Sequence, residues 1–475
     1  MSEPSIKKNV MLSTCYQILN ILLPLITAPY VSRVIGGEGI GIYSFASSVQ
    51  AYFSLFAALG TSIYGTREIA VHRNDIQERS RLFWEIELLS IITSSIMLCG
   101  WMVLVFSQKQ IIYLVLTLNL LNTMADISWF FNGLEEFKIT ILRNACVRII
   151  GAILVFVFVK KAEDLSLYVG IMSVTSLLGT LSMWVVLPKY IVRVKIELNS
   201  IPGHFKQTMV YFIPSIATSV YTVLDKTLIG VITHNAYENG YYEQATKILG
   251  MMKAVAFTSL NSVLRSRISF LFSEKKYDEI KVRISNSIDF ILMIGFGCTF
   301  GLIGISKRFV PWFFGSGYDQ VIDLLIMMSP LVLIIGISNC LGSHYYTPAG
   351  LKRISAEFIV FGAIANLVFN IMLIPRFQAR GAVVSSVIAE TLITILYVRN
   401  CNGYVTWKKL LLLGWKKAAA GAIMAIAVYY VGTIMKVDSL AVILQVIVGI
   451  IVYGVVCLLL KDSFVCKIRG FYDRS

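Results

Sequence analysis

Charged side chains interrupt the long apolar stretches of this sequence, and they are the residues best placed to bind or react. Three lysines lie inside such stretches, at Lys226, Lys247 and Lys253. A lysine at the centre of a membrane-spanning helix costs about 2.5–3.5 kcal/mol on insertion scales, so it must meet water, a counter-ion or a substrate. Lys226 and Lys247 lie nearer the ends of their stretches, from which a long side chain can reach the interface. Lys253 lies near the middle of its stretch, and we expect it to face an anionic substrate.

Arginines mark the ends of other apolar stretches. Arg33 closes the first stretch, while Arg67 and Arg148 stand near the ends of the second and fifth. A guanidinium group can donate two parallel hydrogen bonds to a phosphate, whereas a lysine acts as a point charge. Together with the three lysines, these arginines predict a basic path that suits a phosphate or diphosphate headgroup.

Among the carboxyl groups within or beside the apolar stretches, we select four: Asp126, Asp225, Asp289 and Glu390. Asp225 directly precedes Lys226, but neighbours in a helix point about 100° apart, so the two cannot face each other. Any ion pair that they make must therefore reach across to another helix. We interpret the four carboxyl groups as counter-ions or as proton carriers.

Sequence patterns for other chemistry are missing. There is no G-x-x-x-x-G-K-[ST] loop to hold ATP phosphates. The four histidines are far apart and the eight cysteines lie singly, so neither a metal site nor a catalytic triad is indicated. The glycine-rich segment at 36–41 lacks a preceding strand and is read as a tight turn. We predict no cofactor, no metal, no disulfide and no enzymatic activity.

The elements that carry these residues are predicted to be membrane-spanning helices. Hydrophobic residues make up 57% of the chain and charged residues only 15%, against about a quarter charged in soluble domains. About 20 consecutive apolar residues cross a bilayer as a helix. The fifth candidate is short and lysines interrupt the eighth, so twelve or thirteen spans are alternatives to fourteen. The fourteen candidate spans are 11–32, 40–63, 83–106, 111–131, 145–159, 166–187, 209–232, 246–262, 284–305, 321–342, 355–374, 381–398, 418–435 and 439–460.

The distribution of positive charge predicts the orientation of these spans. If the N-terminus is cytoplasmic, 30 of the 42 Lys and Arg residues fall in cytoplasmic segments and nine in external ones. Such asymmetry is typical of short loops, in which Lys and Arg resist translocation. We therefore expect both termini to be cytoplasmic. The longest external loop, at 306–320, carries an aromatic group that would anchor the chain at the interface.

A short motif occurs twice and hints at two related halves. The pattern G-x-Y-x-x-A begins at Gly41 and again at Gly240, each time after an odd-numbered span. Many transporters consist of two duplicated six-helix halves with the substrate path between them. The repeat is compatible with that architecture.

Four stretches of the sequence resemble the oligosaccharide flippases of the multidrug/oligosaccharidyl-lipid/polysaccharide exporter superfamily. Spread in order over most of the chain, they read PLITAPYVSRVIGGEGIGIYSFASS (24–48), YGTREIAVHRND (64–75), ISWFFNGLEEFKITILRNACVRII (127–150) and NLVFNIMLIPRFQARGAVVSSVIAE (366–390). Arg33 falls in the family's Y-x-x-R-x-x-G stretch and Arg67 in G-T-R-E, so the resemblance assigns both to the substrate. Gln378 departs from the pattern, because the family has a glycine after the I-P-[RK]-F/Y segment.

The resemblance implies an all-α integral membrane fold, with two six-helix lobes around a central cavity and two additional C-terminal helices. On this sequence the lobes would be 1–207 and 208–398, followed by two helices and a cytoplasmic tail at 399–475. It also implies a function: translocation of polyprenyl-diphosphate-linked oligosaccharide repeat units, by alternating access, across the bacterial cytoplasmic membrane for O-antigen, capsule or other surface polysaccharide. Implied partners are that lipid-linked substrate, membrane lipids, a polysaccharide polymerase and glycosyltransferases, and no nucleic acid.

Three alternatives stay open at this point. A lipid-linked cell-wall precursor flippase would use the same mechanism. A cation-coupled drug antiporter of the same superfamily would need aromatic and acidic side chains around its substrate, whereas the excess within these spans is basic. A polytopic polymerase or glycosyltransferase, a different class, would need a long external loop or a carboxylate-rich cytoplasmic one, and the sequence has neither.

Overall fold

The computed structural model describes residues 6–466, and it divides the chain into two compact units, 1–227 and 228–475. Side chains are described throughout that range except at 6–15, 21, 213–215, 217–222, 255–256 and 258–266. The described backbone contains helices and no strand. The all-α prediction is therefore confirmed for the described residues, and each unit is treated in turn.

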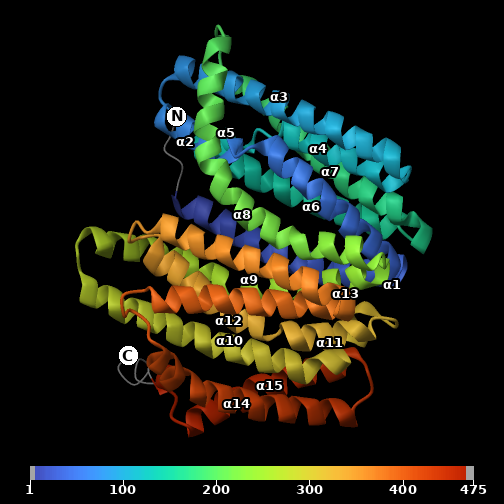
Figure 1. Cartoon of the computed structure of the whole chain (residues 1–475), viewed down its shortest axis with the longest axis vertical. Coiled ribbons are helices and arrows are strands. Elements are labelled where there is room, and N and C mark those ends of the chain that lie inside the picture. Colours follow the sequence, from blue (N-terminus) through green and yellow to red (C-terminus); the bar gives the residue numbers. More distant parts are fainter. Residues whose placement is uncertain (1–5, 467–475) are drawn as a thin grey trace. The chain divides into compact units, whose positions relative to one another are not determined.

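Unit 1 is a bundle of long helices and two short ones (Figure 1). Within it α4 packs against α1, α3 and α7, while the two short helices α2 and α5 pack against each other. Its helices are α1 (Ile6–Ala58), α2 (Thr61–Val71), α3 (Ile76–Gln108), α4 (Ile111–Ala125), α5 (Ser128–Gly133), α6 (Phe137–Phe158), α7 (Leu165–Val186) and α8 (Ile201–Thr233), of which the last few residues belong to unit 2; single 3₁₀ turns occur at Ala162–Asp164, Leu187–Lys189 and Leu198–Ser200.

Unit 2 is built around α10, which packs against α9, α11, α12, α14 and α15. The two C-terminal helices α14 and α15 lie side by side (Figure 1). Its helices are α9 (Ala236–Ser273), α10 (Tyr277–Phe314), α11 (Asp319–Met328), α12 (Pro330–Leu341), a π-helical turn η4 (Gly342–Tyr346), α13 (Lys352–Arg399), α14 (Trp407–Ile434) and α15 (Ser439–Leu459).

Ten helical stretches of the described residues are long and apolar enough to cross a membrane. Two of these stretches, those that contain α1 and α13, have a sharp break, and each of them corresponds to two predicted spans. The helices α8 and α9 are not among the ten, but they coincide with the two remaining predicted spans. The count of fourteen spans stays a prediction.

Several helices continue past the polar residues that end an apolar stretch, so their ends differ from the ends of the predicted spans, which stay predictions. The external loop predicted at 306–320 is mostly helix: α10 runs to Phe314, and its aromatic group belongs to that helix. Lys247 lies well inside α9 and not close to a helix end. Lys417, which directly precedes the predicted span 418–435, lies within α14.

The two helix breaks occur where the backbone leaves the helical region. In α1 the break is at Gly36, with φ 76° and ψ 170°, a conformation that glycine adopts without steric cost. In α13 it is at Gln378, with φ 53° and ψ −132°, which a residue with a side chain adopts only under strain. This backbone geometry explains why the family pattern has a glycine at this position.

The repeated motif has the same local setting in both copies. Gly41 follows the break at Gly36, and Gly240 follows a break between α8 and α9, where His234 has φ 50°. The Asn235 side chain then caps α9 by accepting from the Tyr237 N–H at 3.0 Å. The resemblance between the two segments therefore extends to a helix restart just before each motif.

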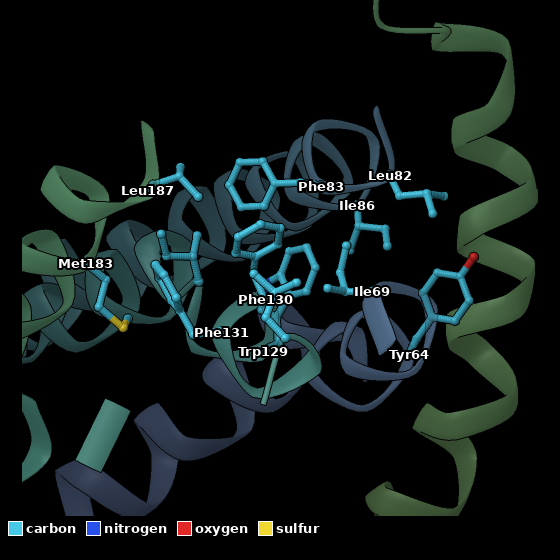
Figure 2. Packing of buried hydrophobic residues seen from close by; sticks show 12 residues of the cluster. Tyr64, Ile69, Leu82, Phe83, Ile86, Trp129, Phe130, Phe131, Met183 and Leu187 are labelled. Atoms are coloured by element: carbon cyan, nitrogen blue, oxygen red, sulfur yellow. The ribbon is translucent and has the colours of Figure 1, made fainter. Parts of the chain in front are cut away.

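An aromatic cluster joins the short helices of unit 1 to α3 (Figure 2). Phe83 of α3 stacks on Trp129 of α5, with ring centroids 5.6 Å apart, and meets Phe130 edge-on. Gly65 of α2 makes this possible, since a Cβ there would overlap the Trp129 ring. In a membrane, where apolar lipid competes with apolar side chains, such close packing across small residues is what holds helices together.

Candidate functional site

Lys253 of α9 and Glu390 of α13 form the centre of the candidate site in unit 2. Lys253 is partly buried near the middle of α9, and Glu390 is the carboxyl group whose charge acts on it. A partly buried ammonium group whose charge is only screened by a carboxylate can bind a phosphate oxygen when substrate arrives. The structure thus places Glu390 within electrostatic range of Lys253, two residues that the sequence suggested separately.

Lys247, six residues before Lys253 on α9, has a partner on its own helix. Its Nζ lies 3.6 Å from Glu243 Oε1, an (i, i+4) pair, and its side chain is 32% exposed. An (i, i+4) pair on one helix contributes only about 0.3–0.5 kcal/mol to stability. Lys247 therefore remains available to an anion, although an anion must compete with Glu243 for it.

Asp225 and Lys226 lie together on α8, at the C-terminal end of unit 1. Asp225 is buried and Lys226 is partly buried. The next residue, Thr227, donates a 2.9 Å hydrogen bond to Ser48 Oγ of α1. Residues 225–227 are thereby held against the second half of α1, in which the repeated motif lies.

The three predicted arginines occupy different elements of unit 1. Arg33 is exposed in α1, three residues before the break at Gly36. Arg67 is 61% exposed on α2 and donates to the Tyr211 hydroxyl at 2.8 Å. Arg148 of α6 is exposed and lies over the Tyr16 ring, 5.9 Å from its centroid. Arg67 and Arg148 therefore have separate partners and do not form one cluster with each other.

Asp289 is a counter-ion of a residue that the sequence did not single out. Its Oδ1 accepts from Lys417 Nζ at 2.8 Å, and the same ammonium donates to Asp462 Oδ2 at 2.7 Å. Ser463 adds a hydrogen bond to Asp289 at 3.2 Å. All three charged side chains are fully buried, so this cluster ties α10, α14 and the end of α15 together within unit 2.

Glu87 of α3 is a second residue that sequence reasoning missed. It is 0% exposed, and neither carboxyl oxygen has a hydrogen-bond partner. Trp129 lies beside it without reaching hydrogen-bonding geometry, and the charge that acts on it comes from Asp126. Asp126 itself caps α4 and accepts from the Ser128 N–H at 2.9 Å. The sequence feature that could have identified Glu87 is its position inside the apolar stretch 83–106.

A buried hydrogen-bonded chain links α2, α3 and the start of α8. His204 lies between the Tyr64 hydroxyl, at 2.7 Å from Nδ1, and Glu85 Oε2, at 2.9 Å from Nε2. Figure 2 shows the Tyr64 hydroxyl directed at α8. Glu85 also accepts from the Glu197 N–H at 3.2 Å. The segment before α8 is thus fastened to α3 of unit 1.

Two family models match the chain over more than half of its length. The model described as polysaccharide biosynthesis protein matches residues 6–269. The model described as lipid II flippase MurJ matches residues 139–449. Both matches include the stretches that carry Lys226, Lys247 and Lys253.

Similar whole proteins are found both by sequence and by structure. An Escherichia coli (strain K12) protein named as an O-antigen transporter is 24% identical over 83% of this chain and 97% of its own. The solved structure titled lipid II flippase MurJ, inward closed conformation, has a TM-score of 0.75 at 14% identity and covers 95% of this chain and 98% of its own. A multidrug resistance MATE family transporter of the MOP superfamily has a TM-score of 0.61 at 13% identity, over 85% and 98% of the two chains. These likenesses establish the fold.

Proposed function

We propose a transport function for this chain, which belongs to the polysaccharide biosynthesis protein family of oligosaccharide flippases. It moves polyprenyl-diphosphate-linked oligosaccharide repeat units across the bacterial cytoplasmic membrane. The product would serve O-antigen, capsule or other surface polysaccharide. The single observation that carries the assignment of substrate chemistry is Lys253, a partly buried ammonium group near the middle of a long helix with Glu390 as its screening charge.

The physical demands of this transport fit the residues present. The polyprenyl tail stays in lipid while the polar head must cross a region from which water is largely excluded. A diphosphate head needs several cations to replace its hydration, and basic residues occur on both units for this purpose: Arg33, Arg67, Arg148 and Lys226 on unit 1, and Lys247 and Lys253 on unit 2. Alternating access would let these cations receive the head without opening a continuous pore.

The setting of the protein follows from the same proposal. It is a multi-pass membrane protein, and we place it in the bacterial cytoplasmic membrane with both termini cytoplasmic, because Lys and Arg concentrate on that side. Its partners would be the lipid-linked oligosaccharide, membrane lipids, and the glycosyltransferases and polymerase that make and use the repeat unit. It would act as a transporter and not as an enzyme.

The test is transport by the purified full-length protein in proteoliposomes. A polyprenyl-diphosphate oligosaccharide with a labelled sugar is placed in one leaflet, and its arrival in the other is read by an impermeant sugar-modifying enzyme. We expect protein-dependent translocation, and slower translocation of the corresponding monophosphate, which carries less charge. Equal rates for the diphosphate and a neutral glycolipid would contradict the proposal. Translocation of only a peptide-bearing cell-wall precursor would favour the precursor flippase instead.

A further inference from the structure

An open groove of about 520 Å³ lies on unit 2, over α10 and between α11 and α14. That volume is within the usual range for small-molecule sites. None of its lining residues belongs to the basic set assigned to the substrate. The lining consists of Ile303 and Lys307 of α10, Asp319, Gln320, Ile322, Asp323 and Ile326 of α11, and Tyr429 of α14.

The groove changes from polar to apolar along its length. Asp319 begins α11 and Ile326 lies about two turns further along that helix. On α10, which runs the opposite way, Lys307 lies one turn nearer the helix end than Ile303. Lys307 and Asp319 therefore lie at one end of the groove, and Ile303 and Ile326 lie deeper in the predicted span. This is the polarity of a lipid molecule standing in one leaflet.

The charges at the polar end suit a ligand that carries both signs. Asp323 is already paired with Arg380 of α13. Among side chains that the structure describes, neither Lys307 nor Asp319 has an ion-pair partner. Lys307 instead lies over the Tyr429 ring, with Nζ 5.7 Å from its centroid. The groove thus offers one cation and one carboxylate that do not neutralise each other.

We propose that this groove binds one zwitterionic aminophospholipid, with the lipid phosphate at Lys307 and the lipid ammonium at Asp319. The isoleucines would contact the acyl chains, and Tyr429 would lie at the headgroup level, where tyrosine is enriched. A polyprenyl diphosphate is a poor occupant, because the carboxylate of Asp319 would face a ligand that has no positive charge of its own. The site is therefore a lipid site separate from the substrate path, in the leaflet that the charge distribution places outside.

The experiment measures lipid binding to the purified full-length protein by native mass spectrometry. Three phospholipids with identical acyl chains are compared: phosphatidylethanolamine, phosphatidylcholine and phosphatidylglycerol. We expect phosphatidylethanolamine to bind about tenfold more tightly than phosphatidylglycerol, the ratio typical of one charge-assisted contact. Phosphatidylcholine should bind less well than phosphatidylethanolamine, because its quaternary ammonium cannot donate a hydrogen bond to Asp319.

Variants locate the binding. Lys307→Gln and Asp319→Asn should each weaken phosphatidylethanolamine binding about fivefold or more, while Lys307→Arg keeps most of it. Lys109→Gln and Glu163→Gln remove matching exposed charges from unit 1 and should change nothing. Equal binding of the three lipids, preference for phosphatidylglycerol, or unchanged binding in both groove variants would overturn the proposal. Because binding is read without transport, failure here leaves the transport function a separate question.

Discussion

Lys417 donates a 2.8 Å hydrogen bond to Asp289, and the two side chains are 0% and 1% exposed. With Asp462 at 2.7 Å, one lysine holds two buried carboxylates that come from different parts of unit 2. Removing the lysine would leave both carboxylates buried without their cation. Such a loss costs far more than an intact buried pair contributes, because desolvation has already occurred.

Lys417→Ala should therefore destabilise the protein by about 3–5 kcal/mol. The measurement is thermal unfolding in detergent together with abundance in membranes. Lys416→Ala is the matched control: its Nζ donates only to the exposed Lys461 carbonyl at 2.9 Å, so little change is expected. Combining Lys417→Met with Asp289→Asn and Asp462→Asn should recover stability. A stable Lys417→Ala protein would show that the cluster is not structural.

Glu87→Gln should keep or raise stability. The Glu87 carboxyl is fully buried and has no hydrogen-bond partner, so it contributes a desolvation cost without a compensating contact. Glutamine preserves the shape and removes the ionisable group, whose charged form cannot be stabilised at this buried position. Glu85→Gln, two residues earlier, should cost about 1–3 kcal/mol, because Glu85 accepts from His204 and from the Glu197 N–H. Unfolding midpoints of the two variants compared side by side decide the matter: equal losses would mean that Glu87 has a stabilising partner.

Gln378→Gly should stabilise α13 at its break. The φ of 53° and ψ of −132° belong to a region open to glycine, and strain of this kind costs about 1–3 kcal/mol. The break is held in place by Glu238 Oε2, which accepts from the Ala379 N–H at 3.0 Å. Thermal unfolding should show a higher midpoint for Gln378→Gly. The neighbouring change Phe377→Gly should lower the midpoint, because glycine inside a helix destabilises the protein by about 1 kcal/mol. A lower midpoint for Gln378→Gly would argue against strain at this residue.

Lys253→Ala should lose most transport while the protein still accumulates in membranes. The ammonium is expected to attract the diphosphate, so Lys253→Arg should keep partial transport, and Lys253→Glu should be worse than alanine because it repels the substrate. Lys247→Ala is the control on the same helix and should have the smaller effect, since Lys247 is paired with Glu243. Export of polysaccharide is measured with protein level. Normal export in Lys253→Ala, or a loss explained by lost protein, would remove Lys253 from the site.

Lys408→Cys and Lys436→Cys, each in a cysteine-free chain, should be labelled from opposite sides of the membrane. Both positions are exposed; Lys408 lies in the first turn of α14 and Lys436 lies just beyond its end, and α14 is long and apolar enough to span. The positive-inside pattern places Lys408 in the cytoplasm and Lys436 outside, so only the cysteine at 436 should react with an impermeant maleimide in intact cells. Labelling of both positions, or of neither, would contradict the proposed topology.

The sequence alone determined the class of protein, since a chain with 57% hydrophobic residues and regularly placed apolar stretches must span a membrane as helices. It also located the two helix breaks, because glycine at 36 and the departure at Gln378 have local backbone causes. Charge inside an apolar stretch is likewise visible in the sequence, which is why Lys253 and Asp289 were selected.

Only the tertiary structure decided which charges meet. Lys417 and Asp289 are 128 residues apart, and His204 and Glu85 are 119 apart, so no helical spacing could pair them. The same holds for Glu87, whose lack of a partner depends on the packing of α3 against α5. Which charged side chains pair in a membrane protein depends on which helix faces pack together. That packing depends on the close fit of residues such as Gly65 and Trp129, and such a fit leaves no periodic pattern in the sequence.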